Sequence, residues 1–190
     1  MKTIRIQTLF TLDMRRRLTW LLMFSTVIML TALHPGKAPA TPGQGFTSTP
    51  VAQGQFDAFN VFNQFVQPNS GNGEHEDAKV WLSSQRTKGL SDGAVLSNVW
   101  QPGGTTGWHT HPGHTLIFVT AGAVTQYQAD DPSCTPHVDT AGMSFVDHGG
   151  KHVHIVRNEG AVVAQAIAIR LVPAGQPGRI DAPDPGNCHF

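Results

Sequence analysis

Charged residues are scarce in this chain, at 14% of 190 residues, and they divide evenly into 13 basic and 13 acidic side chains. Their distribution is uneven, because residues 41–190 hold seven of the basic residues against 12 of the acidic ones. A mildly acidic body lacks the basic surface that nucleic-acid binding requires. The composition therefore argues against a nucleic-acid partner.

Cysteine is nearly absent, since the chain has two of these residues, Cys134 and Cys188. Both lie in stretches rich in turn-forming residues. An even number of cysteines in an exported protein suggests one disulfide, which would hold the C-terminal tail against the domain. Neither cysteine has the electropositive surroundings of a reactive thiol, so we expect a structural link.

Long apolar runs are rare, and the most pronounced one is the uncharged stretch of residues 18–33. It follows Arg15, Arg16 and Arg17 and precedes Ala38-Pro39-Ala40, the pattern of a secretory signal with a small-residue cleavage site. A membrane-spanning helix needs about 20 apolar residues, so we expect residues 1–40 to be a cleaved signal peptide. The alternative is an uncleaved anchor that contacts the membrane. Either reading predicts an exported protein that is periplasmic, secreted or membrane-anchored.

Glycine and proline are abundant, with 20 and 13 residues, which favours short strands and turns over long helices. We expect residues 41–77 to form a flexible Pro- and Gly-rich linker. Within it, phenylalanines recur every three residues from Phe56 to Phe65, a spacing that predicts a short helix.

Residues 78–174 contain short β-branched or aromatic runs separated by turn-forming residues. Seven or eight such strands in one stretch are typical of a closed sandwich or small barrel whose interior can hold a small ligand. Residues 175–190 have no such pattern and are expected to be an irregular tail. The predicted fold class is therefore all-β.

Histidines are concentrated in one part of the chain, since seven of the ten lie between His109 and His154. Neutral imidazole is the commonest metal ligand among side chains. His109 and His111 are two residues apart and would share one face of a strand, as would His152 and His154. Imidazoles converging from two strands, with a coordination position left open, suit a catalytic metal.

The segments around these histidines resemble the two motifs of the cupin family, G-x5-H-x-H-x3,4-E-x6-G and G-x5-P-x-G-x2-H-x3-N. Residues 101–122 resemble the first motif and residues 142–158 the second. The positions that match are His109, His111, Gly122, Gly142, Gly150, His154 and Asn158.

The resemblance is to small single-domain cupins. It implies a double-stranded β-helix, or jelly-roll barrel, over residues 78–174. It also implies a metal site with His109, His111 and His154 as ligands, and it makes a homodimer plausible.

One departure from the first motif bears on the metal, because Thr115 stands where the family has a glutamate. Without that carboxylate, a set of three imidazoles suits zinc, copper, nickel or iron, whereas an anionic ligand would favour iron or manganese. The expected cofactor is a divalent transition metal, with Zn, Fe, Mn, Ni and Cu all open. His114 is a further candidate ligand, although Pro112-Gly113 suggests a turn that would direct the His114 side chain toward the rim of the site.

Roles can also be predicted for the remaining histidines and for Asn158. His152 is the candidate catalytic residue for proton transfer, or an alternative ligand, while His137 and His148 are expected at the rim. Asn158 is expected to cap the turn before Gly160 by a side-chain hydrogen bond.

These features favour an exported metalloenzyme that acts on a small organic molecule as an oxygenase, isomerase or similar enzyme. The alternatives are a non-catalytic module that binds a small ligand or a metal, and a structural protein with a vestigial site.

Overall fold

The computed structural model describes residues 39–67 and 79–190, and every regular element in these ranges is a β-strand. The predicted signal or anchor lies almost wholly outside the described residues. Within the described residues, no helix has the length and apolar character needed to cross a membrane. The strands are β1 (Gln44–Phe56), β2 (Asn60–Gln67), β3 (Lys79–Arg86), β4 (Ser91–Thr105), β5 (His109–Thr110), β6 (Thr115–Ala121), β7 (Ala123–Gln128), β8 (His137–Thr140), β9 (Ser144–Asp147), β10 (His154–Arg157), β11 (Ala164–Pro173) and β12 (Ile180–Asp181).

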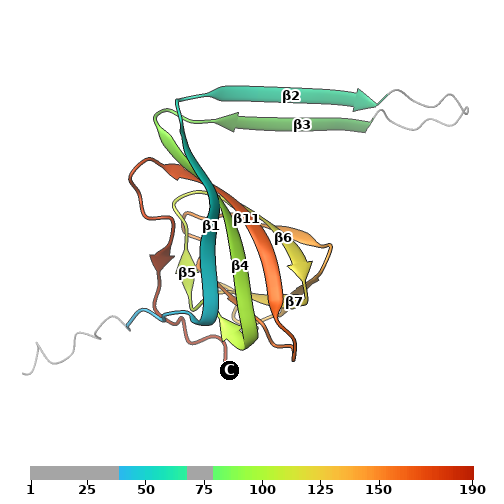
Figure 1. The fold of residues 1–190 in the computed structure, drawn as a ribbon, viewed down its shortest axis with the longest axis vertical. Helices are drawn as coiled ribbons and strands as arrows, with labels where there is room; N and C mark the ends of the chain where they lie inside the picture. The colour runs from blue at the N-terminus through green and yellow to red at the C-terminus, as the bar shows by residue number, and fades with distance from the viewer. Residues whose placement is uncertain (1–38, 68–78) are drawn as a thin grey trace, which may run out of the picture. The chain divides into compact units, whose positions relative to one another are not determined.

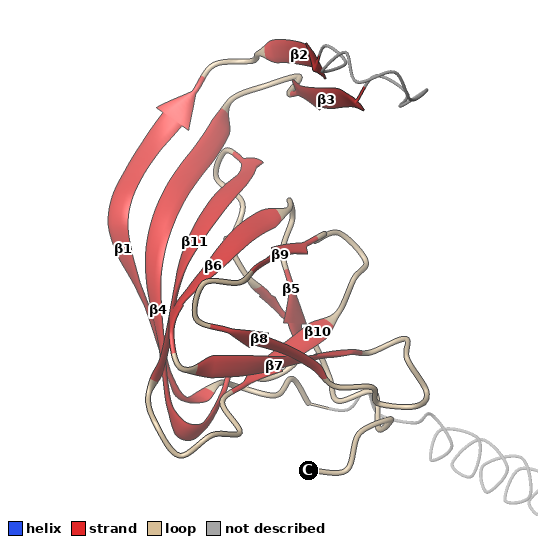
Figure 2. Ribbon diagram, turned by 90° about the vertical axis from the view of Figure 1, so that its right-hand side faces the viewer, coloured by secondary structure: helices blue, strands red, loops and turns tan. Residues whose placement is uncertain are grey.

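Ten of these strands form one antiparallel sheet that curls on itself. Its central order is β12-β5-β10-β4-β11-β6-β9, with β1 added to β4, and β7 pairing both β10 and β8. Figure 2 shows β1, β4, β11 and β6 as one curved wall, and β5, β7, β8 and β10 as the facing wall. The strand pairing confirms the predicted all-β fold class.

Strand β6 shows how the sequence pattern builds the interior. Thr115, Ile117 and Val119 are buried, whereas Leu116 and Phe118 between them are exposed. Alternate residues of a strand point to opposite faces, so Thr115, Ile117 and Val119 face the interior of the barrel. Together with residues from β4, β10 and β11, Ile117 and Val119 form the main apolar core of the barrel.

The linker prediction for residues 41–77 is wrong for the part that the structure describes. Strand β1 pairs with β4 along its length, from Gln44 opposite Thr105 to Phe56 opposite Ser91 (Figure 1). Local composition indicated a mobile segment, but the neighbouring strand satisfies the backbone hydrogen bonds of β1.

The short helix predicted from the phenylalanine spacing is also wrong, because residues 60–67 form β2, paired with β3. Phe65 lies directly opposite Trp81, and Val66 opposite Val80. Aromatic and β-branched cross-strand pairs of this kind stabilise a hairpin, and here they outweigh a three-residue spacing that resembled a helix.

Asn158 is buried and joins three segments of the chain. Its Nδ2 donates to the carbonyl oxygens of Trp100 and Val162, at 3.1 and 2.8 Å. Its Oδ1 accepts from the Gly160 amide at 3.0 Å, which confirms the predicted cap of this turn. The side chain therefore holds the end of β10 against the end of β4.

The C-terminal tail is attached to the barrel at two places. Strand β12 pairs with β5, with Ile180 opposite Thr110, and the predicted disulfide between Cys134 and Cys188 is present. Cys188 packs in a second apolar cluster with Trp108, and Tyr127, Ile155 and Ala182 complete that cluster. The tail thus covers the outer edge of β5.

Removing the disulfide should lower stability. The link spans 54 residues, and the loop-closure entropy of such a length corresponds to about 4 kcal/mol. We expect the double variant Cys134→Ser, Cys188→Ser to lose about 3–4 kcal/mol of unfolding free energy in denaturant titrations, and intact-mass measurements without reductant to find both thiols blocked in the wild type. Two freely alkylated thiols in the wild type, or a loss below about 1 kcal/mol, would contradict this account.

Candidate metal centre

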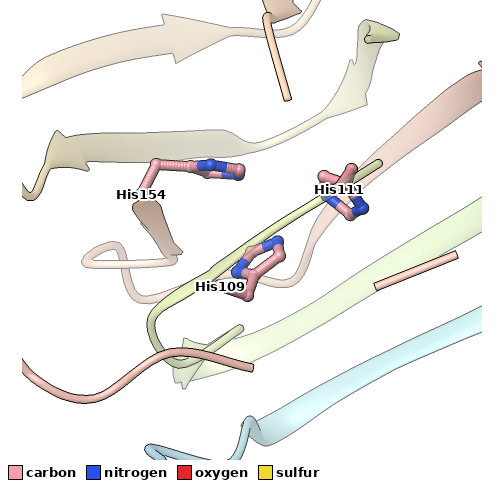
Figure 3. Close-up of side chains that lie close together, drawn as sticks. All are labelled: His109, His111 and His154. Atoms are coloured by element: carbon pink, nitrogen blue, oxygen red, sulfur yellow. The ribbon is translucent and has the colours of Figure 1, made fainter. Parts of the chain in front are cut away.

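Three histidines converge inside the barrel from two paired strands. His109 opens β5 and lies directly opposite His154, the first residue of β10, while His111 follows β5 by one residue. The ring centroids are 4.3 Å apart for His109 and His154, and 4.9 Å apart for His109 and His111. One nitrogen from each ring lies within 4.8 Å of the others (Figure 3), so the three side chains could hold a metal ion.

Burial keeps these imidazoles neutral. His109 and His154 are each 4% exposed, and the His111 side chain is 11% exposed. Loss of hydration lowers the pKa of all three, and for His109 the nearby His154 lowers the pKa further, because two protonated rings would repel. Neutral imidazole is the form that binds a metal.

Backbone carbonyls determine which nitrogen of two of these rings carries the proton. His109 Nδ1 lies 2.8 Å from the Gly107 carbonyl oxygen, and His111 Nδ1 lies 2.6 Å from that of Gly178. A carbonyl oxygen can only accept, so each Nδ1 is the donor. The Nε2 lone pairs of His109 and His111 are then free to bind a metal, and the carbonyls orient the rings.

A carboxylate that the sequence reasoning missed lies beside these rings. Asp147 ends β9, and its side chain is 2% exposed. Its Oδ2 lies 3.1 Å from His111 Nε2, its Oδ1 lies 3.6 Å from His154 Nδ1, and Oδ1 also accepts from the Gly149 amide at 2.9 Å. The one sequence feature that could have pointed to this carboxylate is its position, because Asp147 stands directly before the turn that leads to His154.

Asp147 supplies the charge that Thr115 lacks. The two residues lie directly opposite each other on β9 and β6, so their side chains leave the sheet on the same face. Thr115 is buried, and its hydroxyl has no hydrogen-bond partner in the described part of the chain. A buried carboxylate therefore lies beside the three imidazoles, and the sequence did not predict it.

The positions of Asp147 and His111 fit a shared cation. Asp147 Oδ2 is buried without a hydrogen-bond partner among residues 39–67 and 79–190, and it faces His111 Nε2. Two lone pairs at this distance repel unless a proton or a metal lies between them. Ligand atoms at about 2.0–2.2 Å from one metal, at right angles, are about 3 Å apart, so the observed separation suits two ligands of one ion.

The other predicted site residues lie elsewhere. His114 is exposed and lines a separate apolar groove of about 830 Å³ with Phe56 and Leu116. His152 is exposed, with its ring centroid 5.2 Å from that of His148. Strand β10 begins at His154, so the alternation that suggested an inward His152 does not extend back to it. Neither His114 nor His152 belongs to the converging group, and His137 is exposed on β8.

A cavity of about 340 Å³ adjoins the three histidines inside the barrel. Apolar side chains, the three histidines and two arginines line it. The apolar residues include Leu96, Ile117, Phe145 and Ala168, and the polar ones include Thr115, Arg170 and Arg179. The site can therefore accept a small molecule beside a bound metal.

Comparison with known proteins gives matches among solved structures alone, since no protein-family model and no curated protein matches the chain. A protein from Klebsiella pneumoniae with a double-stranded β-helix domain is 22% identical, over 47% of this chain and 70% of that one, with a TM-score of 0.40. A cupin-superfamily protein from Desulfitobacterium hafniense is 11% identical, over 59% and 78%, with a TM-score of 0.37. An oxalate oxidase is 24% identical, over 43% and 46%, with a TM-score of 0.35.

All three of these matches have TM-scores of 0.40 or below. The chain spans less than half the length of the oxalate oxidase. Because every match is partial, the fold assignment rests on the strand pairing described above. The chemistry of the site rests on its own residues.

The metal-free protein should lose stability in acid. The unfolded chain's histidines take up protons below a pKa of about 6.5, whereas the folded chain's buried histidines do not, so stability falls as pH drops below that value. Each such histidine contributes at most about 1.4 kcal/mol per pH unit. We expect denaturant titrations in chelator to show a smaller loss between pH 7 and 5 for His109→Gln than for the wild type, with His137→Gln as control. An unchanged loss in His109→Gln would contradict this.

Proposed function

We propose that the protein binds one divalent transition metal through His109, His111, His154 and Asp147, and acts on a small organic molecule held in the adjoining cavity. The observation that carries this proposal is the convergence of three buried imidazoles on an unpartnered carboxylate oxygen. A bound metal would supply Lewis-acid polarisation of the substrate. The chain's own residues bind and orient the substrate and exclude bulk water from it.

The carboxylate widens the choice of metal. Three imidazoles and one carboxylate suit iron and manganese as well as zinc, nickel and copper. An ion that prefers six ligands would keep two positions open toward the cavity, which favours an oxygenase, an isomerase or a related enzyme. A four-coordinate ion would be saturated by the four side chains, which favours a non-catalytic binding protein. The coordination number therefore separates the two candidate functions.

Asp147 is the carboxylate of the proposed metal site. Its Oδ1 is held by the Gly149 amide, while its Oδ2 faces His111 Nε2. His152, which the sequence suggested for proton transfer, is exposed and lies beside His148, outside the group of converging histidines.

We further propose that the protein is exported, with residues 1–40 as its signal peptide or membrane anchor. The disulfide between Cys134 and Cys188 supports an oxidising compartment outside the cytoplasm. Intact mass of the protein recovered from its native compartment tests the cleavage, since a mature chain that begins after Ala40 would have lost the segment.

Metal content tests the site. We expect the wild type and the control His148→Ala, which alters an exposed histidine, to contain about one equivalent of metal by plasma mass spectrometry. The double variant His109→Ala, His111→Ala should contain essentially none. Asp147→Asn keeps the shape but removes the charge, and should weaken the metal affinity about 10- to 100-fold. Equal metal content in the wild type and the double variant would remove the site from these residues.

A further inference from the structure

Three polar residues form one row across neighbouring strands of the barrel wall. Thr115 on β6 lies directly opposite Asp147 on β9 and directly opposite Arg170 on β11. Direct partners in antiparallel strands project from the same face of the sheet. Arg170 therefore extends toward the same interior as Thr115, and both line the cavity next to the histidines.

Gly178 connects Arg170 with the metal centre. Its carbonyl oxygen accepts from His111 Nδ1, and its Cα lies against the Arg170 guanidinium. A Cβ at this position would clash with the guanidinium group, so glycine leaves the space that the arginine occupies. One residue of the C-terminal segment thus orients both a candidate ligand and a cation.

Arg170 has no counter-charge in the described part of the chain. Its Nε is buried without a hydrogen-bond partner, and no carboxylate of residues 39–67 or 79–190 pairs with its guanidinium. Burial also lowers its pKa. The other arginine of the cavity, Arg179, differs because it binds both the Asp181 carboxylate and the Thr106 carbonyl oxygen.

Arg170 is half-buried, and a partly desolvated guanidinium without an acceptor gains more from a bound anion than one in open water does. We propose that Arg170 binds the carboxylate of a small organic acid whose hydrocarbon part occupies the barrel cavity. This inference rests on the proposed function, because it places the substrate in the cavity that adjoins the metal centre.

The cavity sets limits on the acid. A volume of about 340 Å³ is near the lower end for ligand sites, so the acid is small. Leu96, Ile117 and Phe145 form an apolar part of the wall, which suits a short hydrocarbon chain rather than a second charged group. These features favour a monocarboxylate over inorganic phosphate, although a guanidinium can bind either anion.

A titration of the wild type tests the charge preference without any substitution. Isothermal calorimetry would compare butyrate with butyramide, which has nearly the same shape and no charge, and with inorganic phosphate. We expect butyrate to bind about 10- to 100-fold more tightly than butyramide, the range for a charge-assisted hydrogen bond. Equal affinities for acid and amide, or tighter binding of phosphate, would overturn the proposal.

The same titration in chelator separates Arg170 from the metal as the group that holds the carboxylate. We expect the preference for butyrate to persist in the metal-free protein. Loss of the preference on metal removal would assign the carboxylate to the metal and overturn the role of Arg170.

Variants then locate the site. Arg170→Gln should bind butyrate about 10- to 100-fold more weakly, while Arg170→Lys should retain part of the affinity because it keeps the charge. The control Arg157→Gln removes an exposed arginine that pairs with Glu159, and should bind butyrate as the wild type does. Wild-type affinity in Arg170→Gln would overturn the proposal.

Metal content of the same samples keeps the two hypotheses distinct. A protein that loads metal normally but does not distinguish butyrate from butyramide lacks the anion site and retains the proposed metal centre. A protein that binds no metal but still prefers butyrate through Arg170 retains the anion site and lacks the proposed metal-dependent function.

Discussion

The pairing of β5 with β10 is the contact on which the candidate site depends. It places His109 opposite His154, residues that are 45 positions apart in the sequence, with both side chains on one face. β5 is very short, and β12 of the C-terminal segment pairs with its other edge. The disulfide at Cys188 then secures the end of that segment. Stability of the tail and geometry of the site are thus linked.

The site balances buried charges of opposite sign. Burial holds three imidazoles neutral, and two of them receive fixed orientations from the carbonyl oxygens of Gly107 and Gly178. Asp147 adds one negative charge, and Arg170 adds one positive charge two strands away in the same row. Under the two proposals, a divalent metal would bind the unpartnered oxygen of Asp147, and a small carboxylate would pair with Arg170.

Features governed by local pattern could be predicted from the sequence. The turn residues around Asn158 predicted its side-chain cap, and the motif spacing led to the three converging histidines. Features that depend on strand register could not be predicted. Asp147 and Arg170 reach the site only because β9 and β11 both pair with β6. The sequence of each strand by itself does not indicate which strands pair. Strand β1 was not predicted for the same reason. It forms by pairing with β4, and its own composition does not indicate that pairing.

The central claim is that the histidines and Asp147 hold one metal. A crystal structure of the metal-loaded protein, with anomalous scattering recorded at the metal's absorption edge, tests it directly. The account predicts one strong peak about 2.0–2.2 Å from Nε2 of His109 and His111, from a ring nitrogen of His154 and from a carboxylate oxygen of Asp147. A peak at the exposed pair His148 and His152, with the three buried imidazoles free of metal, would contradict it.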